Sequence, residues 1–476
     1  QLLVDLFCAK FVDHIGYRVC IVASEIFAAL GLLGLAFLPD FLPDPFIFAL
    51  ILSAIVFLLG VLTNGETPYQ MVLHWGNGFW GFLGFSMQMV LVIIFGNCLA
   101  TAPIFHKLVK KLALIPKTPK QAVAFVTFSA AIATLIQWGF GLVIGAILAK
   151  EVAKTVKKVD YPLLIASAYS TFMLSVLTSS ITLKAASNVD ELTKITGGTV
   201  TQLISLGTTS YHITTLIALL IMLITLPLLN AAMHPSEEHT KTIDANLLKE
   251  ETVVMERPEK PTVAQRLEYS KIIPILIFIS GITFVINHFF ILGKSLNIDI
   301  MNFILLIFGI LLHKTPINYI QAVGNAARNS AGIILQFPFY AGIMGMMTGL
   351  NSTGVSIAGL ISEKMVALSS PHTFPLLSFG SAAIVNMFVP SAGGQWAVQA
   401  PVLFPAGHAL GVSPALTTMS LCWGDTWTNM IQPFWALPAL GIAKLGVRDI
   451  MGYCVMVFLW TGIIILASIL MWTYIF

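Results

Sequence analysis

The densest group of polar residues in an apolar part of the sequence lies at residues 390–399. Its glycines let a ligand approach the backbone, its serine and glutamines can form hydrogen bonds, and its tryptophan offers an apolar wall. Close packing of two helices is the alternative explanation, because small residues also permit that. Since polar side chains accompany the glycines, we favour a solute-binding site with Ser391, Gly393, Gly394, Gln395, Trp396 and Gln399 as candidate residues.

A second cluster follows at residues 424–429, where Asp425 and Asn429 lie inside an apolar run. An acid within a membrane span is costly unless it serves a proton, an ion or a solute. A structural pairing of Asp425 with a threonine or with backbone is the alternative. We predict that Asp425 holds a proton or a coupling ion, and that Asn429 is a ligand of the solute.

These clusters belong to a chain of 476 residues that is 57% hydrophobic and only 10% charged. A soluble domain usually carries about 25% charged residues, so the surplus apolar surface must face lipid. Apolar runs of about 20 residues are long enough to span a bilayer. Such runs and shorter candidates occur near 45–63, 80–100, 161–182, 203–230, 272–292, 299–312, 329–349, 414–440 and 450–475. The sequence therefore predicts an all-α polytopic membrane protein.

Several other function classes are disfavoured by the sequence. A net charge of +3 is too small to indicate a nucleic-acid partner. The GxGxxG pattern at 76–81 follows no strand, so it is not a dinucleotide site, and no GxxxxGK[ST] pattern for ATP occurs. The histidines and cysteines show no metal-ligand spacing, and no HExxH or GxSxG pattern occurs. We therefore expect no enzyme activity, no cofactor and no metal.

The chain divides at residues 231–271, which mix acids, bases and proline and are predicted to form a cytoplasmic linker. A first transmembrane repeat is expected at 41–230, a joining helix at 272–298 and a second repeat at 299–476. Residues 1–40 are set apart as a doubtful N-terminal extension. They begin with Gln1, residues 13–18 resemble a loop motif of major facilitator carriers, and an apolar helix at 19–38 does not fit the topology of the rest.

Three short segments recur in the same order in the two halves. Residues 86–89 resemble 334–337, residues 137–139 resemble 395–397, and residues 161–164 resemble 413–416. One match would be chance, whereas three in order indicate an internal repeat.

The distribution of lysine and arginine predicts that this repeat is inverted. Loop 102–121 contains five lysines and should be cytoplasmic, whereas its counterpart 350–373 has one lysine beside a glutamate. Conversely, loop 64–78 has no lysine or arginine, whereas its counterpart 313–328 has one of each. Corresponding loops therefore lie on opposite sides of the membrane.

Two segments are predicted to be re-entrant helical hairpins. Run 122–149 has basic loops at both ends, so it should enter and leave on the cytoplasmic side, with Gln137, Trp138 and Gly139 near its tip. Segment 374–412 would be the mirror hairpin, with residues 393–396 at its tip. If the tips meet near the midplane, helix N-termini and amide groups there could bind a carboxylate without a buried arginine. The solute residues of the first half are therefore predicted to be Gln137, Trp138 and Gly139.

The sequence also resembles the short-chain fatty acid transporter family, the acetoacetate and butyrate permease type of bacteria. The resemblance covers about 42–476. It is carried by residues 42–49, 75–80, 138–143, 312–316, 336–343, 389–401, 432–438 and 446–454. It implies a secondary carrier of the ion-transporter superfamily, with inverted repeats and paired re-entrant hairpins. Ala392, Ala400 and the stretch 174–188 depart from the glycine-rich pattern of the family.

The leading hypothesis is therefore a symporter in the bacterial inner membrane that takes up a short-chain carboxylate, such as butyrate or acetoacetate, together with a proton or a sodium ion. A dicarboxylate or amino-acid carrier of the same superfamily is the nearest alternative. A polytopic membrane enzyme, or a scaffold subunit of a larger complex, is a more distant one. The expected partners are the solute, the coupling ion and lipid. The sequence leaves the coupling ion and a homodimer open.

Overall fold

The computed structural model describes residues 45–244, 258, 261–294 and 297–475, so the predicted extension 1–40 lies outside the described residues. Every regular element in the described ranges is a helix. Seven helices there are long and apolar enough to cross a membrane: Phe46–Thr63, Pro119–Ile136, Tyr161–Ala185, Ile213–Ala232, Ile272–Ile291, Ala331–Thr348 and Val447–Ile475. The prediction of an all-α polytopic membrane protein is confirmed.

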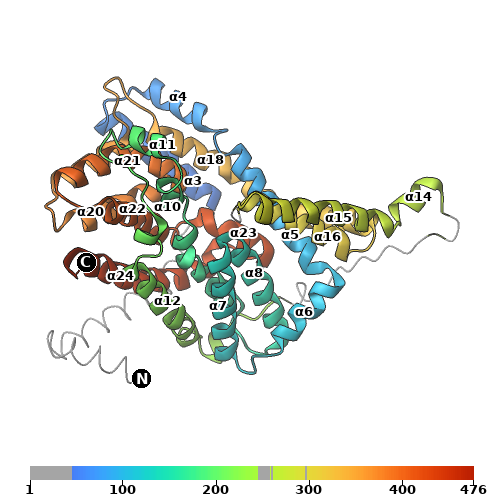
Figure 1. Ribbon diagram of the computed structural model, residues 1–476. Helices are drawn as coiled ribbons and strands as arrows, with labels where there is room; N and C mark the ends of the chain where they lie inside the picture. Colours follow the sequence, from blue (N-terminus) through green and yellow to red (C-terminus); the bar gives the residue numbers. More distant parts are fainter. Residues whose placement is uncertain (1–44, 245–257, 259–260, 295–296, 476) are drawn as a thin grey trace.

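Both halves of the chain consist of helices in the described ranges (Figure 1). The first half contains α3 (Pro45–Thr63), α4 (Pro68–Gly78), α5 (Leu83–Thr101), α6 (Pro103–Ala113), α7 (Pro119–Ile136), α8 (Trp138–Thr155), α9 (Tyr161–Ser170), α10 (Ser180–Ala185), α11 (Val189–Ile195) and α12 (Ile213–Ala232). The second contains α16 (Ile298–Leu312), α17 (Pro316–Ala327), α18 (Ala331–Thr348), α19 (Ile357–Ala367), α20 (Phe374–Asn386), α21 (Ala392–Ala409), α22 (Pro414–Thr428), α23 (Pro433–Ala443) and α24 (Val447–Ile475). The inverted relation of the halves stays a prediction.

Each half contains a helix pair at the place where a hairpin was predicted. Only Gln137 separates α7 from α8, and the backbones of Gly141 and Gly145 lie close to Thr134 and Ala130. The two helices therefore run antiparallel along each other. In the second half, residues 387–391 connect α20 to α21. The re-entry of these pairs into the membrane stays a prediction.

Two segments are interrupted helices, although their hydropathy predicts continuous ones. After α9, the backbone forms a 3₁₀ helix, η1 (Thr171–Thr178), before α10 begins, and residues 429–432 separate α22 from α23. Gln432 lies in an extended conformation and Pro433 starts α23, as expected because proline suits the first turn of a helix. All ten residues of α9 are buried, and α22 packs against η1 and α10. The two broken helices therefore form the centre of the molecule.

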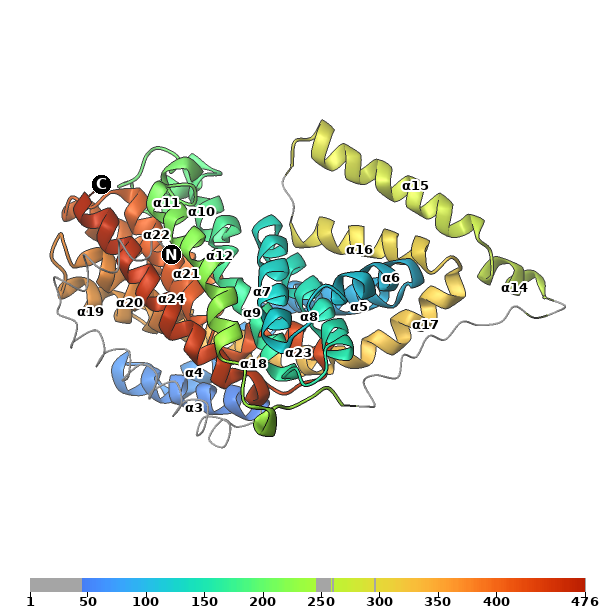
Figure 2. The same ribbon diagram turned by 90° about the horizontal axis from the view of Figure 1, so that it is seen from below.

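The periphery is more open, because α14 (Val263–Glu268) and α15 (Ile272–Ile286) project from the rest, with α16 between α15 and α5 (Figure 2). Helix α15 packs mainly on α16 through a small apolar cluster around Val285, Ile300 and Ile307. Most other side chains of α15 are exposed and apolar, as expected for a helix in lipid.

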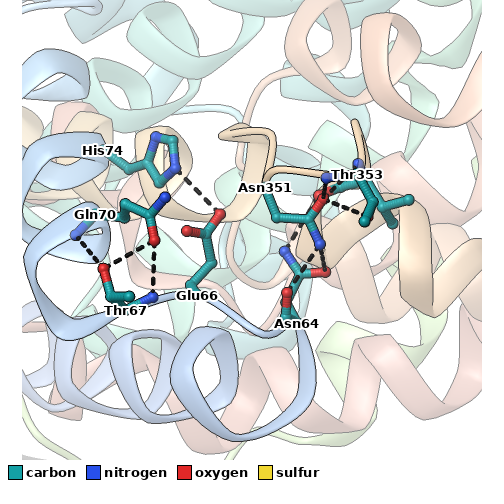
Figure 3. Close-up of polar contacts among 8 residues, drawn as sticks. Asn64, Glu66, Thr67, Gln70, His74, Asn351 and Thr353 are labelled. Atoms are coloured by element: carbon teal, nitrogen blue, oxygen red, sulfur yellow. Dashed lines mark hydrogen bonds and ion pairs between the residues drawn. The ribbon is translucent and has the colours of Figure 1, made fainter.

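The two halves meet beside α4 (Figure 3). The Nδ2 of Asn351, after α18, donates to the backbone oxygen of Asn64 at 2.8 Å, and the Nδ2 of Asn64 donates to the oxygen of Val355 at 3.2 Å. Beside them, Glu66 lies 3.2 Å from the Nε2 of His74. These contacts hold the loop after α3 against the loop after α18.

The start of the predicted linker 231–271 is held against α9. The Oδ2 of Asp160 accepts from the backbone nitrogen of Lys241 at 2.8 Å, and the nitrogen of Tyr161 donates to the oxygen of Lys241 at 2.8 Å. Lys158 and Glu237 form an exposed ion pair of 2.5 Å. The chain therefore leaves α12 through a docked segment, whereas the linker residues 245–257 and 259–260 lie outside the described residues.

Left-handed backbone conformations occur at two kinds of residue. Three lysines have positive φ angles of 59°, 67° and 56°: Lys158, Lys314 and Lys444. The glycines with positive φ in the described ranges are Gly65, Gly197, Gly198, Gly293, Gly354 and Gly411. Lys444 ends α23, and so occupies a place where glycine is the usual residue.

Candidate solute site

The second hairpin turn is capped by Ser391, whose Oγ accepts a hydrogen bond from the backbone nitrogen of Gly394 at 3.3 Å. A Cβ on Gly394 would lie 3.1 Å from the Sδ of Met344, so the missing side chain allows α18 to approach α21. At Gly393, the same position lies 3.3 Å from the Nζ of Lys184. Gly394 thus allows close packing of two helices, and Gly393 leaves room for the ammonium group of Lys184 near the start of α21.

Gln395 and Gln399 follow on α21 and are fully buried. The Nε2 of Gln395 donates to the oxygen of Ala382 at 2.8 Å, and the Nε2 of Gln399 donates to the Oγ of Ser362 and of Ser381 at 2.9 and 3.0 Å. The Oε1 of each glutamine has no hydrogen-bond partner among the described residues. Each amide therefore has an oxygen acceptor without a partner, while its Nε2 donates within the protein.

Asn386 joins α20 to the break after α22. Its Nδ2 lies 2.7 Å from the backbone oxygen of Asp425, 3.0 Å from the Oγ1 of Thr428 and 2.6 Å from the Oδ1 of Asn429. Asn386 is fully buried and Asp425 is 5% exposed. The Oδ1 of Asp425 has no partner among the described residues. The predicted pair Asp425 and Asn429 thus lies in one network, with Asn386 as its donor.

This bundle of α20, α21 and α22 is rich in buried oxygen acceptors without partners in the described part of the chain: Asn386 Oδ1, Gln395 Oε1, Gln399 Oε1 and Asp425 Oδ1. Buried acceptors are costly when they are left unpaired. A proton on the carboxylate of Asp425, or a cation in contact with it, would relieve that cost at this residue.

The first hairpin turn has a related construction. Gln137 caps α8 by accepting a hydrogen bond at its Oε1 from the nitrogen of Phe140 at 2.8 Å. The ring of Trp138 lies 5.6 Å from that of Phe172 and 5.3 Å from that of Trp435. A Cβ on Gly139 would lie 3.3 Å from Met301. This turn is therefore packed against η1, α23 and α16.

The broken helices connect the two turns. The hydroxyl of Tyr169, on α9, donates to the backbone oxygen of Asn429 at 2.6 Å. Trp435, on α23, packs against both Trp138 and Phe172. No hydrogen bond between described residues joins 137–139 directly to 391–399, so the predicted meeting of the two tips stays a prediction.

Sequence reasoning missed four residues that the structure adds to this region: Tyr169, Lys184, Asn386 and Trp435. Asn386 was visible as an amide in an apolar segment, and Lys184 as a cation at the end of an apolar run. Tyr169 and Trp435 carried no signal, because aromatic residues are ordinary in membrane helices.

Comparison with known proteins agrees with the resemblance in the sequence. Residues 28–472 match the family described as short chain fatty acid transporter. Two proteins provisionally named short-chain fatty acid transporters are each 41% identical over 431 residues, which is 90% of this chain. They come from Escherichia coli K12, with 96% of the relative covered, and Haemophilus influenzae Rd, with 95% covered. A protein provisionally named basic amino acid antiporter YfcC, from Escherichia coli K12, is 33% identical over 104 residues, or 21% of this chain and 19% of the relative.

Among solved structures, the YdaH transporter of Alcanivorax borkumensis is similar with a TM-score of 0.41 and 17% identity, covering 89% of this chain and 98% of that one. The family match spans nearly the whole sequence, including the broken helices and both helix pairs. With its apolar helices, the protein is a multi-pass protein of the bacterial inner membrane. The chain belongs to the short-chain fatty acid transporter family.

Proposed function

We propose that this protein takes up short-chain monocarboxylates such as butyrate and acetoacetate as a secondary symporter, driven by a gradient of protons or of another cation. The names of the two 41% identical relatives support the solute class. Two helix breaks in the buried centre support transport, because irregular backbone at membrane depth is tolerated where it lines a cavity or is buried in protein.

The observation that supports coupling of solute uptake to a cation is the environment of Asp425. Asp425 is 5% exposed, its Oδ1 lacks a partner in the described residues, and Asn386, which contacts its backbone oxygen, also has an Oδ1 without a partner there. Such a group is stable when it carries a proton or contacts a cation. Asp425 is therefore the proposed coupling site, and the bound cation would also balance the charge of a carboxylate solute.

The solute is proposed to lie beside the two helix turns. In the first half, Gln137, Trp138 and Gly139 border the aromatic cluster at η1 and α23. In the second half, the α21 start carries Ser391, Gly393, Gly394, Gln395, Trp396 and Gln399, with Asn429 on the neighbouring break. Helix N-termini at both turns favour an anionic group.

The test is uptake of labelled butyrate and acetoacetate into proteoliposomes under an imposed proton or sodium gradient. Wild type should accumulate the solute under one of these gradients. Asp425→Asn should abolish gradient-driven accumulation, because it removes the charge that binds the cation. Asp449→Asn is the matched control, since its Oδ2 accepts from the nitrogen of Gly446 at 2.9 Å at the start of α24, a role that an asparagine oxygen can keep.

Absence of butyrate and acetoacetate uptake under both gradients would contradict the monocarboxylate assignment. A carrier of dicarboxylates or amino acids is the second candidate, favoured by the local similarity to the protein provisionally named basic amino acid antiporter YfcC. The same liposomes should therefore also receive succinate, glutamate and arginine. Accumulation of one of these without the monocarboxylates would support that candidate.

A further inference from the structure

Gln432 lies at the break between α22 and α23 and is fully buried. Its Oε1 accepts a hydrogen bond from the nitrogen of Phe434 at 2.8 Å, which caps α23. The Nε2 of the same amide has no hydrogen-bond partner among the described residues, although it is buried. Because Oε1 and Nε2 share one carbon, this unused donor lies at the N-terminus of α23.

Two features of this position favour an anion. A buried donor without a partner is costly, and an anionic oxygen would satisfy it. The N-terminus of α23, a helix of 11 residues, carries partial positive charge and unpaired backbone donors. In contrast, the Nε2 of Gln395 and of Gln399 each donate at least one hydrogen bond within the protein, so the Nε2 of Gln432 is the amide nitrogen of the three that has no partner in the described part of the chain.

An apolar wall lies next to this donor. Trp435 is the third residue of α23, and its ring centroid lies 5.3 Å from those of both Trp138 and Phe172. Tyr169 extends the cluster, with its ring 6.1 Å from that of Phe172. Residues from α8, η1 and α23 therefore gather aromatic surface beside a single amide donor. An inorganic anion would use the donor alone, whereas a short acyl carboxylate would use both.

We propose that Gln432 Nε2 and the N-terminus of α23 bind the carboxylate of the solute, while Trp138, Phe172 and Trp435 contact its acyl chain and select its length. This inference rests on the proposed function, since it assumes a short-chain carboxylate as the solute. It assigns the anion to the break in the second half and leaves the oxygen-rich bundle around Asp425 to the cation.

The first experiment measures butyrate uptake by Gln432→Glu in proteoliposomes. Glutamate keeps an oxygen to cap α23 but replaces the donor by a negative charge at neutral pH. The KM relative to wild type should rise at least tenfold at pH 7.5, because the negative charge repels the carboxylate that the amide donor would bind. Gln265→Glu is the matched control, because the Oε1 of Gln265 also accepts from a backbone nitrogen at a helix start, that of Thr262 at 2.9 Å, in the linker and far along the chain from the site.

The second experiment measures chain-length preference with acetate, butyrate, hexanoate and octanoate. Phe172→Ala removes one ring from the wall, so the preference should move from butyrate to hexanoate by at least fivefold in kcat/KM. Loss of folding alone would lower all rates without changing their order. Melting of the purified variants in detergent serves as the folding check.

The outcomes separate the two proposals. If wild type accumulates no short-chain carboxylate, the proposed function fails. If wild type transports butyrate, but Gln432→Glu keeps KM within twofold and Phe172→Ala keeps the chain-length order, the carboxylate site at α23 is refuted while the function stands.

Discussion

Substitution of Asn386 by alanine is the most informative perturbation of the buried centre. One amide group holds the end of α20 to three acceptors around the break after α22: the oxygen of Asp425, the Oγ1 of Thr428 and the Oδ1 of Asn429. No other described side chain donates to all three. The substitution therefore removes the donor and leaves the acceptors buried.

The expected loss of stability follows from the number of N–H groups on the Asn386 side chain. An amide has two N–H groups, so the three contacts of 2.6–3.0 Å share two hydrogens. Each bond contributes about 0.5–1.5 kcal/mol net, and acceptors left buried without partners add a further penalty. We expect Asn386→Ala to lower the free energy of unfolding by about 2–4 kcal/mol.

The assay is reversible unfolding in mixed micelles, followed with Asn386→Ala, Asn429→Ala and the double variant. Because the two side chains share one bond, their effects should be less than additive by about 0.5–2 kcal/mol. Asn325→Ala is the control, since this half-buried asparagine on α17 forms no side-chain hydrogen bond to a described residue. A loss at Asn386 no larger than that at Asn325, or strict additivity with Asn429, would refute the network.

Three further predictions concern other parts of the fold. Lys184→Gln should raise the KM for butyrate about two- to fivefold, because it removes one exposed positive charge near the start of α21. Lys184→Arg keeps the charge and should leave the KM unchanged. Equal KM values for the two variants would contradict an electrostatic role. Gly345→Ala should lower the stability of the protein in detergent by about 1–3 kcal/mol, because its Cβ would clash with the backbone oxygen of His74. Gly324→Ala is the control and should leave the stability unchanged, because the space beside Gly324 is open. Asp160→Ala should speed tryptic cleavage at Lys241 about tenfold in inside-out vesicles, because the hydrogen bond from the nitrogen of Lys241 to the Asp160 carboxylate is lost. Unchanged cleavage would show that the linker is held by other contacts.

The sequence predicted the membrane class and the family correctly because both depend on local composition and on ordered motifs. Runs of apolar residues report which segments lie in lipid, and the matches to the family are confirmed. The helix break at Gln137 was also predicted, since basic loops at both ends of 122–149 exclude a single span. These inferences need no knowledge of which segments touch.

The breaks in the other two helices were not predicted, and the reason is physical. The run 414–440 is apolar on average although it contains Asp425 and Asn429, so its hydropathy does not reveal the turn of the backbone at 429–432. Gln432 caps α23 because its backbone is extended and its side chain accepts one hydrogen bond. Neither property can be predicted from amino-acid composition. Lys184 and Asn386 were missed because their partners are far away in the chain.

The left-handed residues described above differ in the side of the membrane on which their loops are predicted to lie. On the sides predicted from loop charge, the three lysines with positive φ lie in cytoplasmic loops, and the six described glycines with positive φ lie in outer loops. The positions of these glycines took no part in assigning the sides. A lysine in this conformation costs roughly 1–2 kcal/mol that glycine does not.

With these predicted sides, the strained turns coincide with positive charges that would fix the direction of insertion, and the relaxed turns lie on the opposite side. Replacing Lys158, Lys314 and Lys444 by glycine would make each turn easier to form and would remove three charges from the cytoplasmic face. At these turns, a substitution that makes the turn more stable also removes a charge that would orient the protein in the membrane. Selection for thermal stability alone would therefore favour variants that insert in both orientations.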